Sequence, residues 1–149
     1  MKFFKKLSRS VKGRVAIITG AGSGMGEATA KVFAAEGVKV VATDVDQKSV
    51  DRVSEEINNS KGECTALKLD VTDKSDIDNC LKQTVDIYGS LDFIINNAGI
   101  ASVTSIEDEN YEDYWDDTLN VVLTGQIRLI RAALPQLLKS DNARIVNIS

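Results

Sequence analysis

The 149-residue sequence contains no histidine and only two cysteines. Without histidine the chain can form neither a Ser-His-Asp triad nor a Cys-His pair, which excludes both types of nucleophilic hydrolase. Cys64 and Cys80 do not form a Cys-x-x-Cys motif, so no metal site is expected. We expect both to serve as small apolar side chains of a protein in a reducing compartment.

Long hydrophobic runs are also missing. No stretch approaches the roughly 20 apolar residues that a membrane-spanning helix needs, so no membrane span is expected. The large apolar residues near the start, Phe3, Phe4 and Leu7, are too few for the apolar segment of a signal peptide. These absences predict a cytoplasmic protein.

Charge is distributed unevenly along the chain, whose formal net charge is −4. The first 14 residues contain no acidic residue but six basic ones: Lys2, Lys5, Lys6, Arg9, Lys12 and Arg14. From Val15 on, the chain contains the remaining 12 basic residues and all 22 acidic ones. This acidic excess argues against a nucleic-acid partner. We expect residues 1–13 to form a solvated basic leader, with weak contact to an anionic surface as the alternative.

From residue 14 on, short apolar runs alternate with longer amphipathic stretches. Strands are expected at residues 15–18, 38–43, 65–69, 91–95 and 144–148, with helical patterns between them. Strands that are apolar on both faces and alternate with helices predict an α/β fold. We expect a doubly wound parallel sheet of about five strands, a Rossmann fold, over residues 14–149. Such a sheet binds its ligand at the carboxyl ends of the strands, near the point where the strand order reverses.

Two of the helical patterns carry an apolar stripe. The helix that follows Ser23 would turn Ala28, Val32 and Ala35 inward and end at Gly37. In the longest helical pattern the apolar residues step by three or four: Leu119, Leu123, Ile127, Ile130, Leu134 and Leu137. Acidic residues near the start of this helix, including Glu112 and Asp113, suit the positive end of the helix dipole.

A glycine-rich turn joins the first expected strand to the first helix. Its sequence is Thr19-Gly20-Ala21-Gly22-Ser23-Gly24-Met25-Gly26. Glycines let the main chain approach a pyrophosphate closely, and the free amides of the helix start bind phosphate charge. The alternative is a glycine-rich turn without a ligand. The spacing is not GxGxxG, because Met25 takes the place of the last glycine.

Asp44 closes the second expected strand. A carboxylate at this place can accept hydrogen bonds from both hydroxyls of an adenine ribose, and it would repel a 2′-phosphate. Positions 23 and 45 hold Ser23 and Val45 rather than a lysine or arginine, so the pattern favours NAD over NADP. Two alternatives remain: an aspartate in a surface turn, and a different doubly wound module such as a methyltransferase that binds S-adenosylmethionine.

Five motifs, in order from Lys12 to Ser149, resemble the short-chain dehydrogenase/reductase family. The TGxxxGxG turn of this family is matched by Thr19, Gly20, Gly24 and Gly26, and its NNAG by Asn96-Asn97-Ala98-Gly99. The other matches are Leu69-Asp70-Val71-Thr72, Asn120 to Gly125, and Arg144 to Ser149. The resemblance implies hydride transfer between the nicotinamide of NAD and a small-molecule carbonyl or alcohol carbon. It also implies, for a complete protein, a homodimer or homotetramer that uses the long helix from about Tyr111.

The resemblance assigns roles to individual residues. The expected cofactor-binding residues are Thr19, Gly20, Ser23, Gly24, Met25, Gly26, Asp44, Asp70, Val71, Asn97, Ala98 and Gly99. Asp70 and the Val71 backbone would contact the adenine, whereas Asn97 and Gly99 would lie against a cofactor ribose or, alternatively, tie adjacent strands together. Asn120 would be a catalytic residue that holds a water of a proton relay, and capping a helix kink is its alternative role.

One departure from the family concerns activity. The family uses a serine, a tyrosine and a lysine four residues after the tyrosine. The positions four residues after Tyr88, Tyr111 and Tyr114 hold Asp92, Trp115 and Thr118, and Ser149 aligns one residue before the catalytic serine. We therefore expect a cofactor-binding portion that is truncated before the Tyr-x-x-x-Lys motif and is inactive alone. The alternative is a short product that binds NAD, or pairs with complete subunits, without catalysis.

Overall fold

The computed structural model of the chain describes residues 10–101 and 104–148. Its strands are β1 (Val15–Thr19), β2 (Lys39–Asp44), β3 (Glu63–Lys68), β4 (Phe93–Asn96) and β5 (Arg144–Asn147). Its helices are α1 (Gly24–Ala35), α2 (Gln47–Asn59), α3 (Lys74–Tyr88), α4 (Tyr111–Leu119), the π-helical segment η1 (Asn120–Gly125) and α5 (Gln126–Leu137). Every expected strand is present, with its ends shifted by at most two residues.

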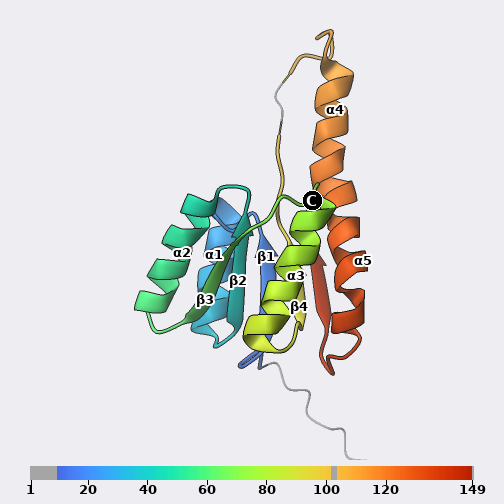
Figure 1. Ribbon diagram of the computed structural model, residues 1–149. Helices are drawn as coiled ribbons and strands as arrows, with labels where there is room; N and C mark the ends of the chain where they lie inside the picture. Colours follow the sequence, from blue (N-terminus) through green and yellow to red (C-terminus); the bar gives the residue numbers. More distant parts are fainter. Residues whose placement is uncertain (1–9, 102–103, 149) are drawn as a thin grey trace, which may run out of the picture.

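The five strands are parallel and lie in the order β3-β2-β1-β4-β5. The chain moves from β1 to one edge through β2 and β3, and then returns to the other side of β1 for β4 and β5. Helices α1 and α2 cover one face of the sheet, and α3 and α5 cover the other (Figure 1). This arrangement confirms the doubly wound parallel sheet that the sequence predicts, with the strand order reversing between β1 and β4.

β1 lies at the centre of the sheet, and all five of its residues are buried. Ala16 and Ile18 belong to the core under α1 and α2, whereas Ile17 belongs to the core under α3 and α5. Successive side chains of a strand point to opposite faces, so a strand that is covered on both sides must be apolar throughout. The continuous apolar run at residues 15–18 is therefore explained by burial on both faces of the sheet.

The buried face of α1 differs from the predicted one. The residues predicted to face inward, Ala28, Val32 and Ala35, are exposed, Val32 by 60%. The buried residues are Gly26, Ala30 and Ala34. Small side chains at every fourth position let α1 lie close to the sheet. The prediction was wrong because it followed the face that contains Val32, whereas the face that packs on the sheet carries only glycine and alanine.

The long helical pattern is divided into α4, η1 and α5, and most of its apolar stripe does not face the sheet. Of the residues in this stripe, Leu123, Ile127 and Leu134 are exposed by 51%, 49% and 45%, and only Leu137 is fully buried. The buried residues of α5 are Gln126, Leu129, Ala133 and Leu137. Two apolar stripes lie side by side on this helix, and periodicity alone does not show which one meets the sheet. The buried stripe is hard to recognise in the sequence because it contains the polar Gln126 and the small Ala133.

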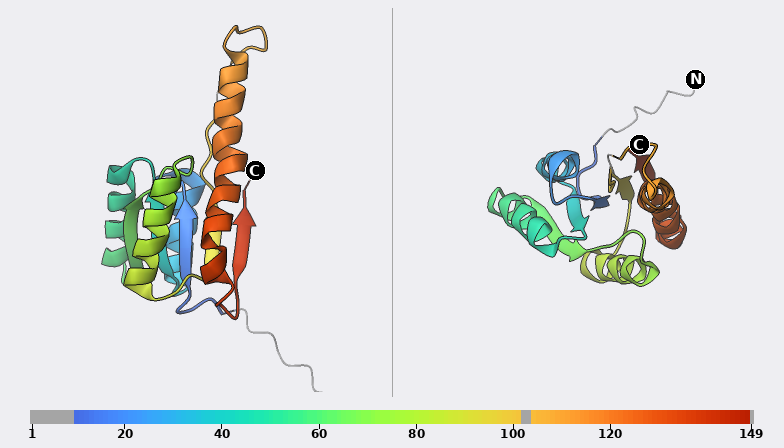
Figure 2. Two further views of the ribbon diagram at one scale, coloured as in Figure 1. Left: turned by 45° about the vertical axis from the view of Figure 1, so that its right-hand side comes forward. Right: turned by 90° about the horizontal axis from the view of Figure 1, so that it is seen from above.

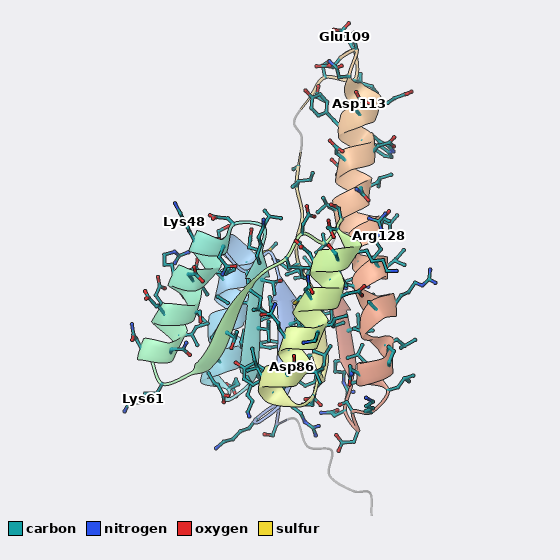
Figure 3. The ribbon with its side chains drawn as sticks, in the orientation of Figure 1. Lys48, Lys61, Asp86, Glu109, Asp113 and Arg128 are labelled. Atoms are coloured by element: carbon teal, nitrogen blue, oxygen red, sulfur yellow. The ribbon has the colours of Figure 1, made fainter. Side chains whose placement is uncertain are left out.

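α4 projects beyond the carboxyl ends of the strands and covers neither face of the sheet (Figures 1 and 2). None of its residues is buried. The rings of Tyr111 and Trp115 stack on each other with centroids 6.4 Å apart, and acidic side chains, including Glu109 and Asp113, surround the tip (Figure 3). The apolar residues of this helix therefore contact water or one another rather than the core.

A buried carboxylate fastens the opposite end of the sheet. Asp92, directly before β4, is only 5% exposed. Its Oδ2 accepts a hydrogen bond from the Val15 amide at 2.9 Å, and its Oδ1 accepts from Arg14 Nη1 at 3.1 Å and from the Ser140 hydroxyl. Arg14 Nη1 also contacts Asp141 Oδ1 at 2.6 Å. Asp92 thus joins the starts of β1 and β4 to the turn after α5.

The described part of the basic leader is attached to the body. Val11 packs against the core under α1 and α2, and the Gly13 amide donates to the Gly37 carbonyl at 2.7 Å. Residues 1–9 lie outside the described part of the chain. Within residues 10–101 and 104–148, no helix combines the length and the apolar character needed to cross a bilayer.

Both cysteines are buried and free. Burial raises the pKa of the Cys80 thiol to about 12 and also raises that of Cys64. Both therefore remain protonated at neutral pH and pack as small apolar side chains. In the described ranges, no group of three or more cysteine, aspartate and glutamate side chains is arranged to hold a metal ion.

Candidate functional site

A cleft of about 120 Å³ opens at the carboxyl ends of the strands, where the strand order reverses. It is lined by Gly20, Asp44, Val45, Leu69, Asp70, Val71, Ala98, Gly99, Ile100 and Val121. Six of the predicted cofactor-binding residues line this cleft: Gly20, Asp44, Asp70, Val71, Ala98 and Gly99. Residues far apart in the sequence therefore meet at the place where a doubly wound sheet binds its ligand.

The glycine turn bends sharply between β1 and α1. Gly20 and Gly24 have positive φ angles of 64° and 54°, a conformation that side chains disfavour. Ser23, at the N-cap of α1, is extended and makes no side-chain cap bond. Ser23, Gly24 and Met25 are all exposed. The first amides of α1 thus have no side-chain cap and are open to an anionic ligand.

Close approaches of the main chain also require glycine at Gly26 and give a second reason for glycine at Gly20. A Cβ at Gly26 would lie 2.1 Å from the Gly20 carbonyl oxygen. A Cβ at Gly20 would lie 2.9 Å from Ala98 Cα, so β1 and the segment after β4 approach each other closely. The spacing that differs from GxGxxG therefore still produces a tight turn at the start of a helix.

Asp44 is oriented by two backbone amides. Its Oδ2 accepts from the Gly22 amide at 3.1 Å, and its Oδ1 accepts from the Asp46 amide at 3.2 Å. An ionised carboxylate has about four acceptor positions. Each oxygen therefore keeps the capacity to accept one more hydrogen bond at the edge of the cleft, as a pair of neighbouring sugar hydroxyls would require.

Asn97 and Thr19 lock the glycine turn to the segment after β4. Asn97 Nδ2 donates to the carbonyls of Thr19 and Gly20 at 3.0 and 3.1 Å. Thr19 Oγ1 in turn accepts from the amides of Asn97 and Ala98 at 3.0 and 2.9 Å. The strand-tying role of Asn97 is therefore present in the structure. The buried Asn97 Oδ1 has no hydrogen-bond partner among the described residues, so an acceptor beside the turn is left unused.

Asp70 and Val71 form the wall of the cleft next to β3. Asp70 Oδ1 accepts from the amide and the hydroxyl of Thr72 at 2.8 and 2.7 Å, which fixes the turn before α3. Gly125 of η1 lies against this wall, since a Cβ there would be 2.8 Å from Val71 Cγ2. η1 thus supports the cleft from the side of the long helix.

Asn120 is the first residue of η1 and does not line the cleft, although its neighbour Val121 does. Its Oδ1 accepts from Arg128 Nη1 at 2.9 Å, and the same Arg128 atom donates to the Thr72 carbonyl at 3.1 Å. Arg128 lies where α5 passes the start of α3 (Figure 3). Asn120 therefore links the π-helical segment to the loop that carries Asp70.

Sequence reasoning missed several residues of the site. Leu69 and Val121 lie inside motifs but were given no role in the site, whereas Val45 and Ile100 each follow a predicted residue, Asp44 and Gly99, by one position. Arg52 was missed for another reason. It lies on α2, outside every motif, and reaches the glycine turn through its side chain, with Nη2 donating to the Gly22 carbonyl at 2.9 Å.

Comparison with known proteins agrees with this geometry. The family model described as short chain dehydrogenase matches residues 14–149. An uncharacterized oxidoreductase of Staphylococcus epidermidis is 35% identical to this chain over 93% of the chain and 59% of the relative. A 3-oxoacyl-[acyl-carrier-protein] reductase of Thermotoga maritima is 36% identical, over 93% of the chain and 56% of the relative.

A third relative, a 2,5-dichloro-2,5-cyclohexadiene-1,4-diol dehydrogenase of Sphingobium indicum, is 38% identical over 96% of the chain and 57% of the relative. The chain thus spans between half and two thirds of the length of these relatives. The match of the family model covers β1 to β5 and every residue that lines the cleft. The chain belongs to the short-chain dehydrogenase family.

Proposed function

We propose that this chain binds NAD(H) and forms the cofactor-binding part of an oxidoreductase. The diphosphate would lie over the turn from Gly20 to Gly26, and the adenosine ribose would donate its hydroxyls to Asp44. The adenine would occupy the cleft beside Asp70 and Val71. The proposal rests on the place of the cleft, at the strand-order reversal, and on the conformation of the turn.

The most direct support for the proposal is the orientation of the Asp44 carboxylate. Its two oxygens are already held by the amides of Gly22 and Asp46, so the carboxylate is oriented before a ligand arrives. Charge-assisted hydrogen bonds are about twice as strong as neutral ones. The same negative charge opposes a 2′-phosphate, and positions 23 and 45 supply no cation to offset it. This supports NAD over NADP.

When bound, the cofactor supplies hydride transfer to or from a carbonyl or alcohol carbon of a small molecule. The residues of this chain would bind and orient it: the turn at the diphosphate, Asp44 at the adenosine, and the segment from Asn97 to Gly99 toward the other ribose. The 149 residues contain no Tyr-x-x-x-Lys sequence to move the proton. We therefore propose that these residues bind cofactor without catalysing the reaction on their own. Asn120 would act only in a protein that has those groups.

Pairing of subunits is part of the proposal. The exposed stripe of Leu123, Ile127 and Leu134, together with the unburied α4, offers an apolar surface for a second copy or for another family subunit. A short product that binds NAD or pairs without catalysis remains the alternative, and its binding site would be the same.

The experiment is a titration of the folded chain with NADH and NADPH, followed by nicotinamide fluorescence, with S-adenosylmethionine as a competitor. We expect NADH to bind at least tenfold more tightly than NADPH, and S-adenosylmethionine not to compete. Asp44→Ala should weaken NADH binding by at least about tenfold, because it removes two charge-assisted bonds. Asp86→Ala, which removes an exposed carboxylate at the far end of α3 (Figure 3), should leave binding unchanged. A folded chain that takes up no NADH, or an Asp44→Ala variant with full affinity, would overturn the proposal.

A further inference from the structure

Arg52 reaches from the second turn of α2 to the glycine turn. Its Nη2 donates to the Gly22 carbonyl at 2.9 Å and to Glu27 Oε2 at 2.7 Å. Its Nη1 donates to Glu27 Oε1 at 3.1 Å and to Glu56 Oε1 at 2.8 Å. The pair with Glu27 is bidentate, a geometry that fixes the plane of the guanidinium. Arg52 therefore contacts Gly22 from a defined position rather than as a loose surface cation.

Gly22 is held at both of its polar backbone atoms. Its amide donates to Asp44 Oδ2 at 3.1 Å, and its carbonyl accepts from Arg52. The space around it is closed as well, since a Cβ at Gly22 would lie 2.0 Å from Ser49 Oγ on α2. Gly22, in the middle of the glycine turn, is thus bound through its amide by Asp44 of β2 and through its carbonyl by Arg52 of α2.

We propose that Arg52 is a positioning residue for adenosine recognition: it fixes Gly22, and through the Gly22 amide it orients the Asp44 carboxylate toward the ribose hydroxyls. The inference rests on the proposed NAD(H) function. No motif of the family match contains Arg52, and Arg52 does not line the cleft. Its effect would pass through Gly22 to the Asp44 carboxylate, which would bind the ribose.

The surroundings of Arg52 also bear on the choice of cofactor. It is a basic residue beside the turn, yet its donors already contact two carboxylates and a carbonyl. It is therefore not the free cation that a 2′-phosphate needs. Replacement of Glu27 and Glu56 would be required before Arg52 could turn to such a group.

A double-mutant cycle tests the inference. Dissociation constants for NADH and for AMP, which carries only the adenosine side, are measured for the wild type, Arg52→Met, Asp44→Ala and the double variant. If Arg52 acts through Asp44, Arg52→Met should weaken both ligands by about tenfold in the wild-type background. In the Asp44→Ala background the same change should have less than a twofold effect. Exchange of the Gly22 amide proton should also be faster in Arg52→Met.

Two further variants separate positioning from general stability. Arg52→Lys keeps the charge but loses the planar fork, so it should weaken NADH binding nearly as much as Arg52→Met. Lys82→Met removes an exposed ion pair on α3 and should leave both dissociation constants unchanged. The melting temperature of each variant shows that the comparison is made between folded proteins.

The outcomes are distinct. An Arg52→Met variant that binds NADH like the wild type, or effects of Arg52→Met and Asp44→Ala that simply add, would overturn the role of Arg52 while leaving the proposed function intact. A folded wild type that binds neither NADH nor AMP would overturn both. Coupling between the two sites, with normal binding by Lys82→Met, is the expected result.

Discussion

At the scale of single residues, close contacts of the glycine turn decide what the site tolerates. Gly26 has a carbonyl oxygen where a Cβ would lie, whereas Gly99 has its nearest neighbours at 3.7 and 3.8 Å, which is ordinary contact. Both glycines belong to motifs that sequence reasoning identified. The structure shows that the two are not equally constrained.

Gly26→Ala should therefore destabilise the fold by about 2 kcal/mol or more, because a methyl group is forced against the Gly20 carbonyl. NADH binding should be lost as well, since the turn must shift. Gly99→Ala is the matched control for stability and should change the free energy of unfolding by less than about 0.5 kcal/mol. Urea unfolding of both variants measures the difference, and equal stabilities would show that the turn is more pliable than the contacts indicate.

Glu27 gives a prediction for pH. Hydrogen bonds from Arg52, and then from Lys31, lower the pKa of Glu27 to about 2 from its usual 4.5. The charged form is therefore favoured in the folded state, and this contribution is present above about pH 4.5 and lost as the pH falls toward 2. Glu27→Gln should lower the free energy of unfolding at pH 7 by about 1–3 kcal/mol.

The stability difference between Glu27→Gln and the wild type should shrink between about pH 4.5 and pH 2. Denaturant unfolding at several pH values measures it. Glu56 also contacts Lys31 and Arg52, so the other carboxylate of this network stays in place in the variant. A difference that is constant over the whole range would contradict the role of the Glu27 charge.

At the scale of elements, every strand could be predicted from the sequence, whereas the buried face of α1 was predicted wrongly. Apolar runs with turns at both ends are a local property, so β1 to β5 could be predicted from neighbouring residues alone. The orientation of α1 depends on how closely Gly26, Ala30 and Ala34 let it approach the sheet, which is a property of the packed molecule. The same holds for α5, where two apolar stripes compete for one sheet.

In the candidate site, too, residues set by local sequence could be predicted, and residues set by packing could not. Asp44 ends β2 and Asn97 follows β4, and both could be predicted because the carboxyl ends of parallel strands meet at one edge. Arg52 could not, since its contact with Gly22 depends on the distance between α2 and the turn and on the carboxylates of Glu27 and Glu56. For Asn120 the sequence suggested a helix kink only as an alternative, and it did not indicate the π-helical form of the segment.

Asp92 connects three elements at the other end of the sheet, so its replacement should affect the whole fold. Asp92→Ala leaves the Val15 amide and the Ser140 hydroxyl without their acceptor, and we expect a loss of about 2–4 kcal/mol in the free energy of unfolding. Asp141→Asn is the control, since Asp141 contacts the same arginine from an exposed position. Its effect should be much smaller than that of Asp92→Ala, because exposed ion pairs contribute little to stability. Similar losses in the two variants would argue against the fastening role of Asp92.

At the scale of the whole molecule, the exposed stripe on η1 and α5 and the projecting α4 leave apolar surface uncovered. We expect the wild-type chain to self-associate, with a sedimentation mass that rises with concentration. Ile127→Lys, in the middle of the stripe, should shift the protein toward monomer without changing its circular dichroism. Ile87→Lys is matched to it, because Ile87 is equally exposed, by 50%, but lies on α3 outside the stripe. If both variants associate like the wild type, the stripe is not the contact surface.

The central position of β1 has a consequence for how the chain reaches this structure. In sequence, β2 follows β1 by about two dozen residues, whereas β4 is separated from β1 by α1, β2, α2, β3 and α3. Loop closure over that distance costs more entropy, so the unit from β1 to β3 should form first. During that interval the β4 side of β1 leaves its backbone N–H and C=O groups unpaired, on a strand whose side chains are apolar except for Thr19, and another chain can pair with it. Misassembly during refolding should therefore begin at the middle of the finished sheet and not at its borders.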